Sequence, residues 1–357
     1  MSRFLSERFS ALEEYIPGEQ PRDRKYIKLN TNESPYPPSP RTVAAVSAAV
    51  VGDLNLYPDP DCTALTAALA KRYDVDTEQI IISNSSDDLL NFAFTAFCDG
   101  GRGAAFAEIS YGFYEVFANF HCVPYKKLPV ESDFSLDYRK YLALGCNLFL
   151  ANPNAQTGIA LPLEQVEEII KSNPDYVVVV DEAYVDFGAQ SAVSLVDKYE
   201  NLLVTQTFSK SRSMAGARLG FAIGRSGLIA DMKKIKYSTN PYAVNRMTLS
   251  AGEAAIADDG YYMANCRKII ATREYTRAEL ERRGFFVTDS AANFLLASSG
   301  AIGGRELYER LRGEGILVRH FSDAKIENFV RITIGTREQM DALLTAVDKI
   351  LGEANIK

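Results

Sequence analysis

The 357-residue sequence has no tryptophan and two histidines, and its five cysteines form no Cys-x-x-Cys pair. Structural zinc sites need closely spaced Cys and His ligands, so the sequence contains no zinc pattern and we expect no metal. We interpret the cysteines as reduced thiols of a protein core: Cys62, Cys98, Cys122, Cys146 and Cys266.

Long apolar runs and an excess of basic residues are also missing. No run approaches the roughly 18 apolar residues of a membrane span, and the charged start of the chain is unlike a signal peptide. The 46 acidic residues outnumber the 39 Lys and Arg, which gives a net charge of −7 and argues against nucleic acid as a partner. We therefore expect a cytoplasmic protein that binds neither nucleic acid nor membranes.

Motifs of several common enzyme classes are missing as well. The sequence has no phosphate-binding P-loop, no Gly-x-Ser-x-Gly elbow and no His-Glu-x-x-His. The segment Gly101-Arg-Gly103 lacks the third glycine of a dinucleotide fingerprint, and it precedes its predicted strand instead of following it. A nicotinamide-dependent oxidoreductase is therefore disfavoured.

The most informative stretch runs from Thr207 to Gly220, Thr-Phe-Ser-Lys-Ser-Arg-Ser-Met-Ala-Gly-Ala-Arg-Leu-Gly. Lys210 follows an apolar run, and a desolvated amine loses its proton more easily and attacks carbonyls. The neighbouring hydroxyls and Arg218 suit a phosphate. Together they indicate a carbonyl cofactor that carries a phosphate, pyridoxal phosphate above all, although this stretch alone also fits a surface loop.

A second segment, Tyr176-Val-Val-Val-Val-Asp181, has the pattern of a buried parallel strand that ends in a carboxylate. Ligands of open α/β sheets lie at the carboxyl ends of the strands. Pyridoxal phosphate needs an acidic partner that keeps its ring nitrogen protonated, and Asp181 can be that partner. Carboxylates at strand ends also bind metals or riboses, so it is the pairing with Lys210 that favours pyridoxal phosphate.

Two further loops could complete such a site. Asn152-Pro-Asn154-Ala-Gln-Thr-Gly158 has turn signals after an apolar run, and Asn154 could donate to the ring phenolate oxygen, although such a segment is often only a turn. The segment from Asn84 to Asp88 lies between a predicted strand and a predicted helix. Helix N-termini bind anions through free N–H groups, although a simple N-cap also fits.

The order of elements predicts a doubly wound α/β sheet, because apolar strands alternate with helices. The predicted strands of this sheet are 79–83, 103–106, 146–151, 176–181, 202–207 and 219–224, with helices such as 87–97 and 162–172. A long helix over 261–283 leads to strands 285–288, 293–297 and 330–334 and helices 304–314 and 337–351.

Seven motifs in this order resemble the histidinol-phosphate aminotransferase branch of the fold-type-I pyridoxal-phosphate aminotransferases. They are Lys28–Tyr36, Leu56–Asp59, Ser110–Tyr114, Asn152–Gly158, Asp181–Tyr184, Thr207–Gly220 and Val330–Thr336. The resemblance covers the chain from about residue 15 to its end. It implies a large domain over 41–260, a smaller α+β domain over 261–357, and an N-terminal segment, 1–40, that joins the small domain.

The resemblance also implies roles for individual residues. Lys210 would form the aldimine, with Asp181 and Tyr184 completing the catalytic set. Cofactor contacts would come from Ser86, Asp87, Tyr111, Asn154, Asp181, Tyr184, Thr207, Ser209, Lys210 and Arg218, and from Tyr57 of the partner in a homodimer. Substrate contacts would come from Arg331, Arg319, Tyr15 and Asn32.

The implied activity is amino transfer between histidinol phosphate and 2-oxoglutarate in histidine biosynthesis. Three segments near the cofactor depart from the family pattern: Ser85 in place of a glycine, Ala155-Gln156 in place of Asn-Pro, and Ser211–Met214. A threonine-phosphate decarboxylase, another amino-acid aminotransferase and a non-catalytic protein that binds pyridoxal phosphate stay open as alternatives.

Overall fold

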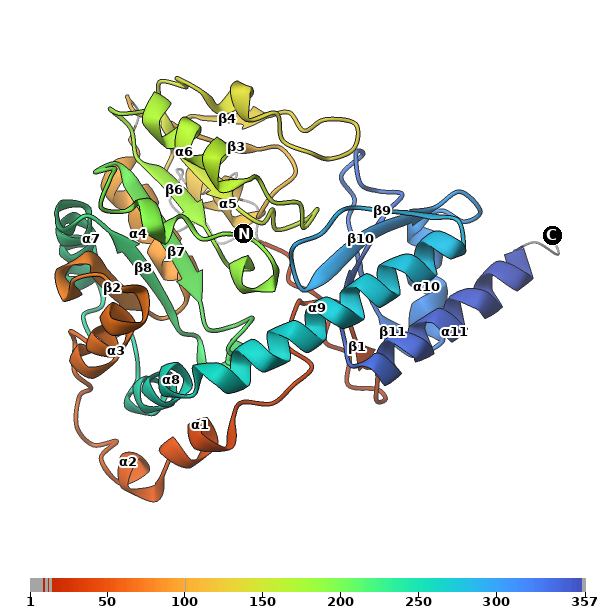
Figure 1. The fold of residues 1–357 in the computed structure, drawn as a ribbon, viewed down its shortest axis with the longest axis horizontal. Coiled ribbons are helices and arrows are strands. Elements are labelled where there is room, and N and C mark those ends of the chain that lie inside the picture. Colours follow the sequence, from red (N-terminus) through yellow and green to blue (C-terminus); the bar gives the residue numbers. More distant parts are fainter. Residues whose placement is uncertain (1–8, 10–11, 13–14, 100, 355–357) are drawn as a thin grey trace.

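The computed structural model describes residues 9, 12, 15–99 and 101–354, which form two larger sheets and a two-stranded one. The long helix α9, Asp259–Arg282, runs between the two larger sheets (Figure 1). The larger sheet has seven strands in the order β2-β8-β7-β6-β5-β3-β4. Their bounds are β2 Ile80–Ser83, β3 Ala104–Ala107, β4 Tyr125–Leu128, β5 Asn147–Ala151, β6 Val178–Asp181, β7 Leu202–Thr207 and β8 Gly220–Gly224. Strand β8 pairs antiparallel with both of its neighbours, β2 and β7, and the remaining pairs of this sheet are parallel.

Helices cover both faces of the larger sheet. One face packs against α4 (Ser86–Phe97), α5 (Phe113–Phe120) and α7 (Ser226–Thr239), and the other against α3 (Thr63–Tyr73), α6 (Leu163–Ser172) and α8 (Arg246–Ala257). Two short helices, α1 (Pro40–Ala45) and α2 (Ala48–Gly52), precede α3. Every residue of β5, β6 and β7 is buried, because strands covered on both faces expose neither set of side chains. The predicted doubly wound α/β fold is confirmed.

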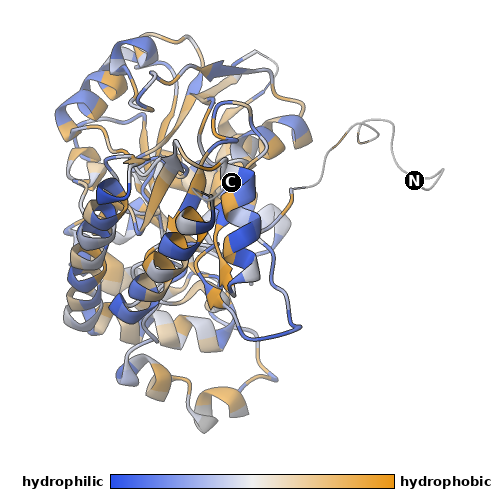
Figure 2. Cartoon of the chain, turned by 90° about the vertical axis from the view of Figure 1, so that its right-hand side faces the viewer, coloured by the Kyte–Doolittle hydropathy of each residue, from blue (hydrophilic) through white to orange (hydrophobic). Residues whose placement is uncertain are grey.

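The smaller sheet is antiparallel and has the order β12-β13-β10-β9. It comprises β9 (Phe285–Val287), β10 (Phe294–Ser299), β12 (Arg319–His320) and β13 (Val330–Thr333), and α10 (Gly304–Gly313) and α11 (Arg337–Ala354) lie beside it. The N-terminal strand β1 (Ile27–Lys28) pairs in parallel with β11 (Ile316–Leu317). In Figure 2 the apolar strands lie behind helices that carry much of the polar surface on this side.

The predicted strands were incomplete, and one cysteine was placed wrongly. Strands β1, β4, β11 and β12 were not predicted: β1, β11 and β12 have two residues each, and β4, Tyr-Lys-Lys-Leu, lies at the edge of its sheet and is polar and half exposed. Cys122 is exposed and is therefore not a core thiol, whereas the other four cysteines are buried. Among the residues that the structure describes, no helix is long and apolar enough to cross a membrane.

Candidate active site

A cavity of about 440 Å³ lies at the carboxyl ends of the parallel strands and is called the pocket below. It brings together residues from the N-terminal segment, the start of α4 and the loops after β5, β6 and β7. Its lining includes Thr31, Ser85, Ser86, Asp87, Tyr111, Ala155, Asp181, Tyr184, Thr207, Ser209, Lys210 and Arg218. Nine of the residues proposed from the sequence therefore share one cavity, all from the cofactor set.

Asp181 is the last residue of β6 and lies at the floor of the pocket, with 4% of its surface exposed. Tyr114 donates a hydrogen bond to its Oδ2 at 2.8 Å, and Thr205 donates to its Oδ1 at 3.3 Å. Burial is the largest influence and raises the pKa of Asp181 to about 6, although the Tyr114 hydrogen bond lowers it. A cation placed beside this carboxylate would hold it in the ionised form.

Lys210 enters the pocket from the loop that follows β7. Its half-buried amine donates to the Thr31 carbonyl at 3.4 Å and lies 5.7 Å from the centre of the Tyr184 ring. The Tyr184 hydroxyl accepts a hydrogen bond from Asn32 Nδ2 at 3.0 Å. Asn32 is therefore close to the lysine, at a left-handed backbone position (φ 54°) that asparagine tolerates better than most residues.

The N-terminus of α4 forms another wall of the pocket. Asp87, in its first turn, accepts hydrogen bonds from Tyr111 at 2.6 Å and from Arg218 at 2.7 Å. Gly220 lies directly behind this turn, since a Cβ added there would be 2.3 Å from the Ser86 nitrogen. Free helix N–H groups and an arginine beside them make this wall suited to an anion.

Ser85 caps α4 in a conformation that favours glycine, with φ 92° and ψ 167°. The departure from the family glycine therefore falls on a position where the backbone requires positive φ. Thr207 and Ser209 also line the pocket. Ser209 N donates to Thr207 Oγ1 at 3.1 Å, which closes a tight turn at the end of β7.

Asn154 lies behind the pocket lining and shapes its own loop. Its Nδ2 donates to the Ile109 carbonyl at 2.8 Å, and its Oδ1 accepts from the backbone N–H groups of Gln156 and Thr157. One amide hydrogen is thus already engaged, and contact with a cofactor phenolate stays a prediction.

Arg331, on β13, lies immediately behind Ala155. Its Nη1 donates to the Ala155 carbonyl and to Gln156 Oε1, both at 2.9 Å. Its Nε is buried and has no hydrogen-bond partner among the described residues. Burial lowers the pKa of this guanidinium.

The other predicted substrate and dimer residues lie further out. Arg319 donates to the carbonyls of Ile16 and Pro17 at 2.9 and 3.1 Å, so backbone groups of the N-terminal segment occupy its guanidinium. Tyr15 packs on Phe113 with 4.4 Å between ring centres. Tyr57 is 78% exposed and stacks on Tyr242, outside the pocket of its own chain.

Three polar residues that contact predicted site residues had no predicted role themselves: Tyr114, Thr205 and Gln156. Tyr114 belongs to a motif used for the resemblance, and its place one helical turn after Tyr111 was the available signal. Gln156 was noted only as a departure from the family pattern. Nothing in the sequence links it to Arg331.

Comparison with known proteins agrees with this geometry. The family described as aminotransferase class I and II matches residues 24–347. The chain belongs to this family. The histidinol-phosphate aminotransferase of Brachyspira hyodysenteriae is 47% identical over 352 residues, which cover 98% of this chain and 99% of the relative. That of a Marinomonas species is 48% identical over 352 residues, or 97% and 99% of the two chains.

A solved aminotransferase structure has the same fold. Histidinol-phosphate aminotransferase from Sinorhizobium meliloti, in complex with pyridoxal-5'-phosphate, superposes with a TM-score of 0.85 at 27% identity and covers 92% of each chain. The predicted membership in the histidinol-phosphate aminotransferase family is confirmed, as is the prediction of an aminotransferase.

Proposed function

We propose that this aminotransferase uses pyridoxal 5'-phosphate to transfer the amino group of histidinol phosphate to 2-oxoglutarate, in histidine biosynthesis. The observation that carries the proposal is the meeting of Lys210, Asp181 and Arg218 in one pocket, at the ends of parallel strands and the start of α4. The choice of substrate rests on the relatives, which match over nearly their full length.

The residues of the pocket fit pyridoxal phosphate. Ser86 and Asp87 offer N–H groups of the α4 N-terminus to the phosphate, with Thr207, Ser209 and Arg218 beside them. Tyr111 and Tyr184 would supply ring and hydroxyl contacts, and Asn154 would donate its second amide hydrogen to the phenolate oxygen. When bound, the cofactor supplies an aldehyde for the substrate amine and an electron sink for the Cα–H bond.

Two side chains of the chain handle protons in this scheme. The Asp181 carboxylate stabilises a proton on the ring nitrogen, and the hydrogen bonds from Tyr114 and Thr205 orient it. With the cofactor bound, Lys210 Nζ would move the proton between the substrate Cα and C4′ of the cofactor. General acid–base catalysis of this kind contributes about 10²–10⁴-fold to the rate.

Arg331 is the proposed anion site for both substrates. The phosphate of histidinol phosphate and a carboxylate of glutamate occupy it in turn, because a planar guanidinium binds either group in a bidentate manner. Arg319 and Asn32 lie on the same side, where the N-terminal segment meets β12 and β13. Tyr15, which packs on Phe113, is the third proposed substrate contact beside Arg331.

The remaining proposals concern the assembly. The exposed Tyr57 reaches the cofactor phosphate of the partner subunit in a homodimer. Residues 41–260 form the large domain, residues 261–357 form the small domain, and the segment 1–40 joins the small domain; residues 1–8, 10, 11, 13, 14, 100 and 355–357 of these ranges lie outside the described residues. The enzyme works in the cytoplasm.

A single-turnover absorbance experiment tests the proposed function. Protein loaded with pyridoxal phosphate is mixed separately with histidinol phosphate, glutamate, phosphothreonine and phenylalanine. We expect histidinol phosphate and glutamate alone to convert the absorption of the aldehyde form to that of the amine form. Conversion by phenylalanine would indicate a broader aminotransferase, and carbon dioxide release from phosphothreonine would indicate a decarboxylase. Absence of any conversion by a protein that binds the cofactor would indicate a non-catalytic binding protein.

A further inference from the structure

Gln156 replaces the proline of the family motif and contacts the arginine proposed to bind the substrate anion. Its side-chain oxygen accepts a hydrogen bond from Arg331 Nη1 at 2.9 Å. The neighbouring Ala155 carbonyl accepts from the same nitrogen, also at 2.9 Å. One corner of the guanidinium is therefore held by two acceptors from one loop.

The opposite side of the guanidinium is not satisfied in the same way. Arg331 Nε is buried and lacks a hydrogen-bond partner among the residues that the structure describes. A buried donor without a partner costs about 1–3 kcal/mol, so such groups call for an explanation. Nε and Nη2 together form the edge that pairs with a carboxylate or phosphate. A substrate anion at this edge satisfies the donor.

Arg331 lies beside the pocket, because the Ala155 carbonyl that accepts from its Nη1 belongs to a residue of the pocket lining. The aromatic rings of Phe294 and Phe321 flank its charge at 5.1 and 5.3 Å. With rings at its sides and two acceptors at Nη1, the guanidinium has little freedom to turn.

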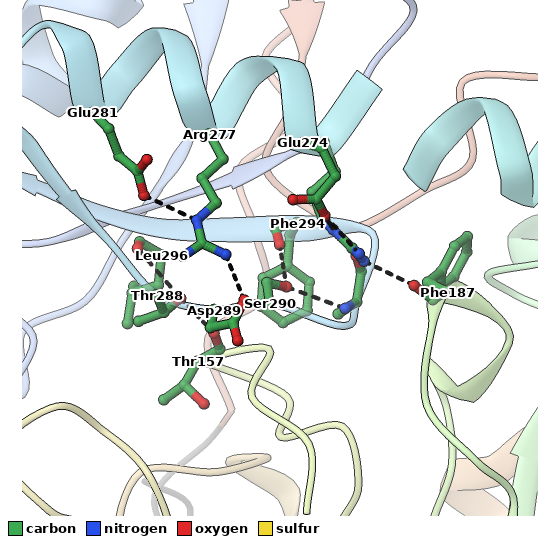
Figure 3. Close-up of polar contacts among 12 residues, drawn as sticks. Thr157, Phe187, Glu274, Arg277, Glu281, Thr288, Asp289, Ser290, Phe294 and Leu296 are labelled. Atoms are coloured by element: carbon green, nitrogen blue, oxygen red, sulfur yellow. Dashed lines mark hydrogen bonds and ion pairs between the residues drawn. The ribbon is translucent and has the colours of Figure 1, made fainter. Parts of the chain in front are cut away.

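The loop that carries Gln156 is itself fixed to the smaller sheet. Thr288 Oγ1 donates to the Thr157 carbonyl at 2.6 Å, and Ala291 N donates to the Gly158 carbonyl at 2.8 Å. Figure 3 shows the loop with Thr157 against the β9–β10 hairpin beneath α9. Strand β10 also pairs with β13, where Leu296 lies opposite Arg331. The Gln156 loop and Arg331 are therefore both held by the smaller sheet.

We propose that Gln156 is a positioning residue for the substrate anion: its side-chain oxygen holds Arg331 Nη1 so that the Nε–Nη2 edge faces the incoming carboxylate or phosphate. This inference rests on the proposed function and specifies how its anion site is oriented. A neutral acceptor is required there, because a carboxylate would neutralise the arginine and compete with the substrate.

Two substitutions test this role. Gln156→Met keeps the length of the side chain but removes the acceptor, and Gln156→Glu replaces the amide with a carboxylate. Gln165→Glu on α6 makes the same chemical change elsewhere and serves as the control. Each protein is compared for its Tm and cofactor absorbance, for KM and kcat with glutamate and with histidinol phosphate, and for the Kd of glutarate. Glutarate is a five-carbon dicarboxylate without an amine, so calorimetry measures its binding without turnover, with and without cofactor.

We expect Gln156→Met to raise both KM values and the glutarate Kd about tenfold, and Gln156→Glu to raise them up to about a hundredfold. The kcat values should stay within about twofold, because the chemistry at Lys210 is untouched. A loss of kcat at constant KM, or an unchanged glutarate Kd in both variants, would overturn the role of Gln156. If Gln156→Glu does not fold, the comparison of Gln156→Met with wild type still tests the role of Gln156.

The outcomes also separate this inference from the proposed function. If the wild-type enzyme does not accept histidinol phosphate but the Gln156 variants still weaken glutamate and glutarate, the substrate is wrong and the positioning role stands. If Arg331→Lys and both Gln156 variants all leave glutarate binding unchanged, the anion binds elsewhere and the positioning role is excluded.

Discussion

The two ends of the proposed site differ in how completely the protein satisfies their polar groups. At the cofactor end, Asp181 accepts from Tyr114 and Thr205, and Asp87 accepts from Tyr111 and Arg218. At the anion end, Arg331 has two acceptors at Nη1 while its buried Nε has none among the described residues. The first end is satisfied by the chain alone, and the second has a donor left over.

This difference follows from the proposed chemistry. A cofactor stays bound through many cycles, so rigid partners around Asp181 keep the ring position constant. The anion end must accept a phosphate and a carboxylate in turn, and a free donor there gains its partner only when a substrate binds. The free-energy cost of an unpaired donor at a functional site is offset by favourable interactions in the rest of the fold.

The largest expected effect comes from the cofactor end. Lys210→Ala removes both the amine that attaches the cofactor and the group that moves the substrate proton, so we expect turnover to fall by at least about ten-thousand-fold. Borohydride reduction followed by peptide mass spectrometry should find cofactor on residue 210 of the wild type and none on the variant. The control Lys234→Ala, on the exposed surface of α7, should keep the label. Turnover at a normal rate by Lys210→Ala would refute the scheme.

The next largest effect concerns the anion end. Arg331→Lys keeps the positive charge but loses the bidentate edge and the contacts to the Gln156 loop. We expect kcat/KM for glutamate and histidinol phosphate to fall together, by about 2 kcal/mol or roughly thirtyfold. Steady-state kinetics with each substrate measure this. An unchanged KM for either one would show that the two anions use different sites.

Asp181 gives a smaller effect that separates stability from activity. Its pKa in the folded, cofactor-free protein is raised to about 6 from an ordinary 3.8, so the folded state binds the proton more tightly than the unfolded state. The stabilisation from this proton is full below about pH 4 and is lost as pH rises through 6. We expect wild type to lose about 3 kcal/mol relative to Asp181→Asn across that window.

Urea unfolding of both cofactor-free proteins at several pH values measures this difference. Relative to wild type, the asparagine variant should gain stability as pH rises through 6 and yet lose most of its turnover, because it cannot keep the ring nitrogen protonated. A wild type that gains stability over the variant as pH rises would contradict the assignment.

The smallest expected effect is at the α4 N-terminus. Ser85 has φ 92°, a strained backbone angle for any residue other than glycine. Ser85→Gly relieves this strain but removes the long 3.3 Å hydrogen bond from Ser85 to Asp87. We expect a net stabilisation of the fold by at most about 1 kcal/mol. Thermal unfolding compares the two proteins, with Ser86→Gly in the helix itself as a control that should destabilise. A destabilising Ser85→Gly would show that the serine contacts outweigh the backbone strain.

The cofactor end was largely predictable from the sequence. Strands β6 and β7 consist of buried apolar runs, and a residue such as Asp181 at the end of such a strand falls at the ligand-binding edge of the sheet. Edge strand β4 was missed, because two lysines in four residues mask its pairing. Cys122 was wrongly predicted to lie in the core. It follows the end of α5, and composition alone does not show whether a residue at a helix end is buried or exposed.

The anion end was predictable only in outline. Arg331 could be named from a motif, but its contact with Gln156 joins residues 175 positions apart. Arg319 was predicted to contact substrate, yet its guanidinium is engaged by the carbonyls of Ile16 and Pro17. Contacts between loops of different sheets depend on how the two sheets pack, and local patterns carry no information about that packing.

The most direct test is a crystal structure of the loaded enzyme with histidinol phosphate. We expect a phosphate oxygen within hydrogen-bond distance of Arg331 Nε, with the Gln156–Arg331 and Tyr114–Asp181 hydrogen bonds retained. A phosphate bound elsewhere, with Arg331 Nε still unpaired, would show that the buried donor at the anion end does not serve the substrate.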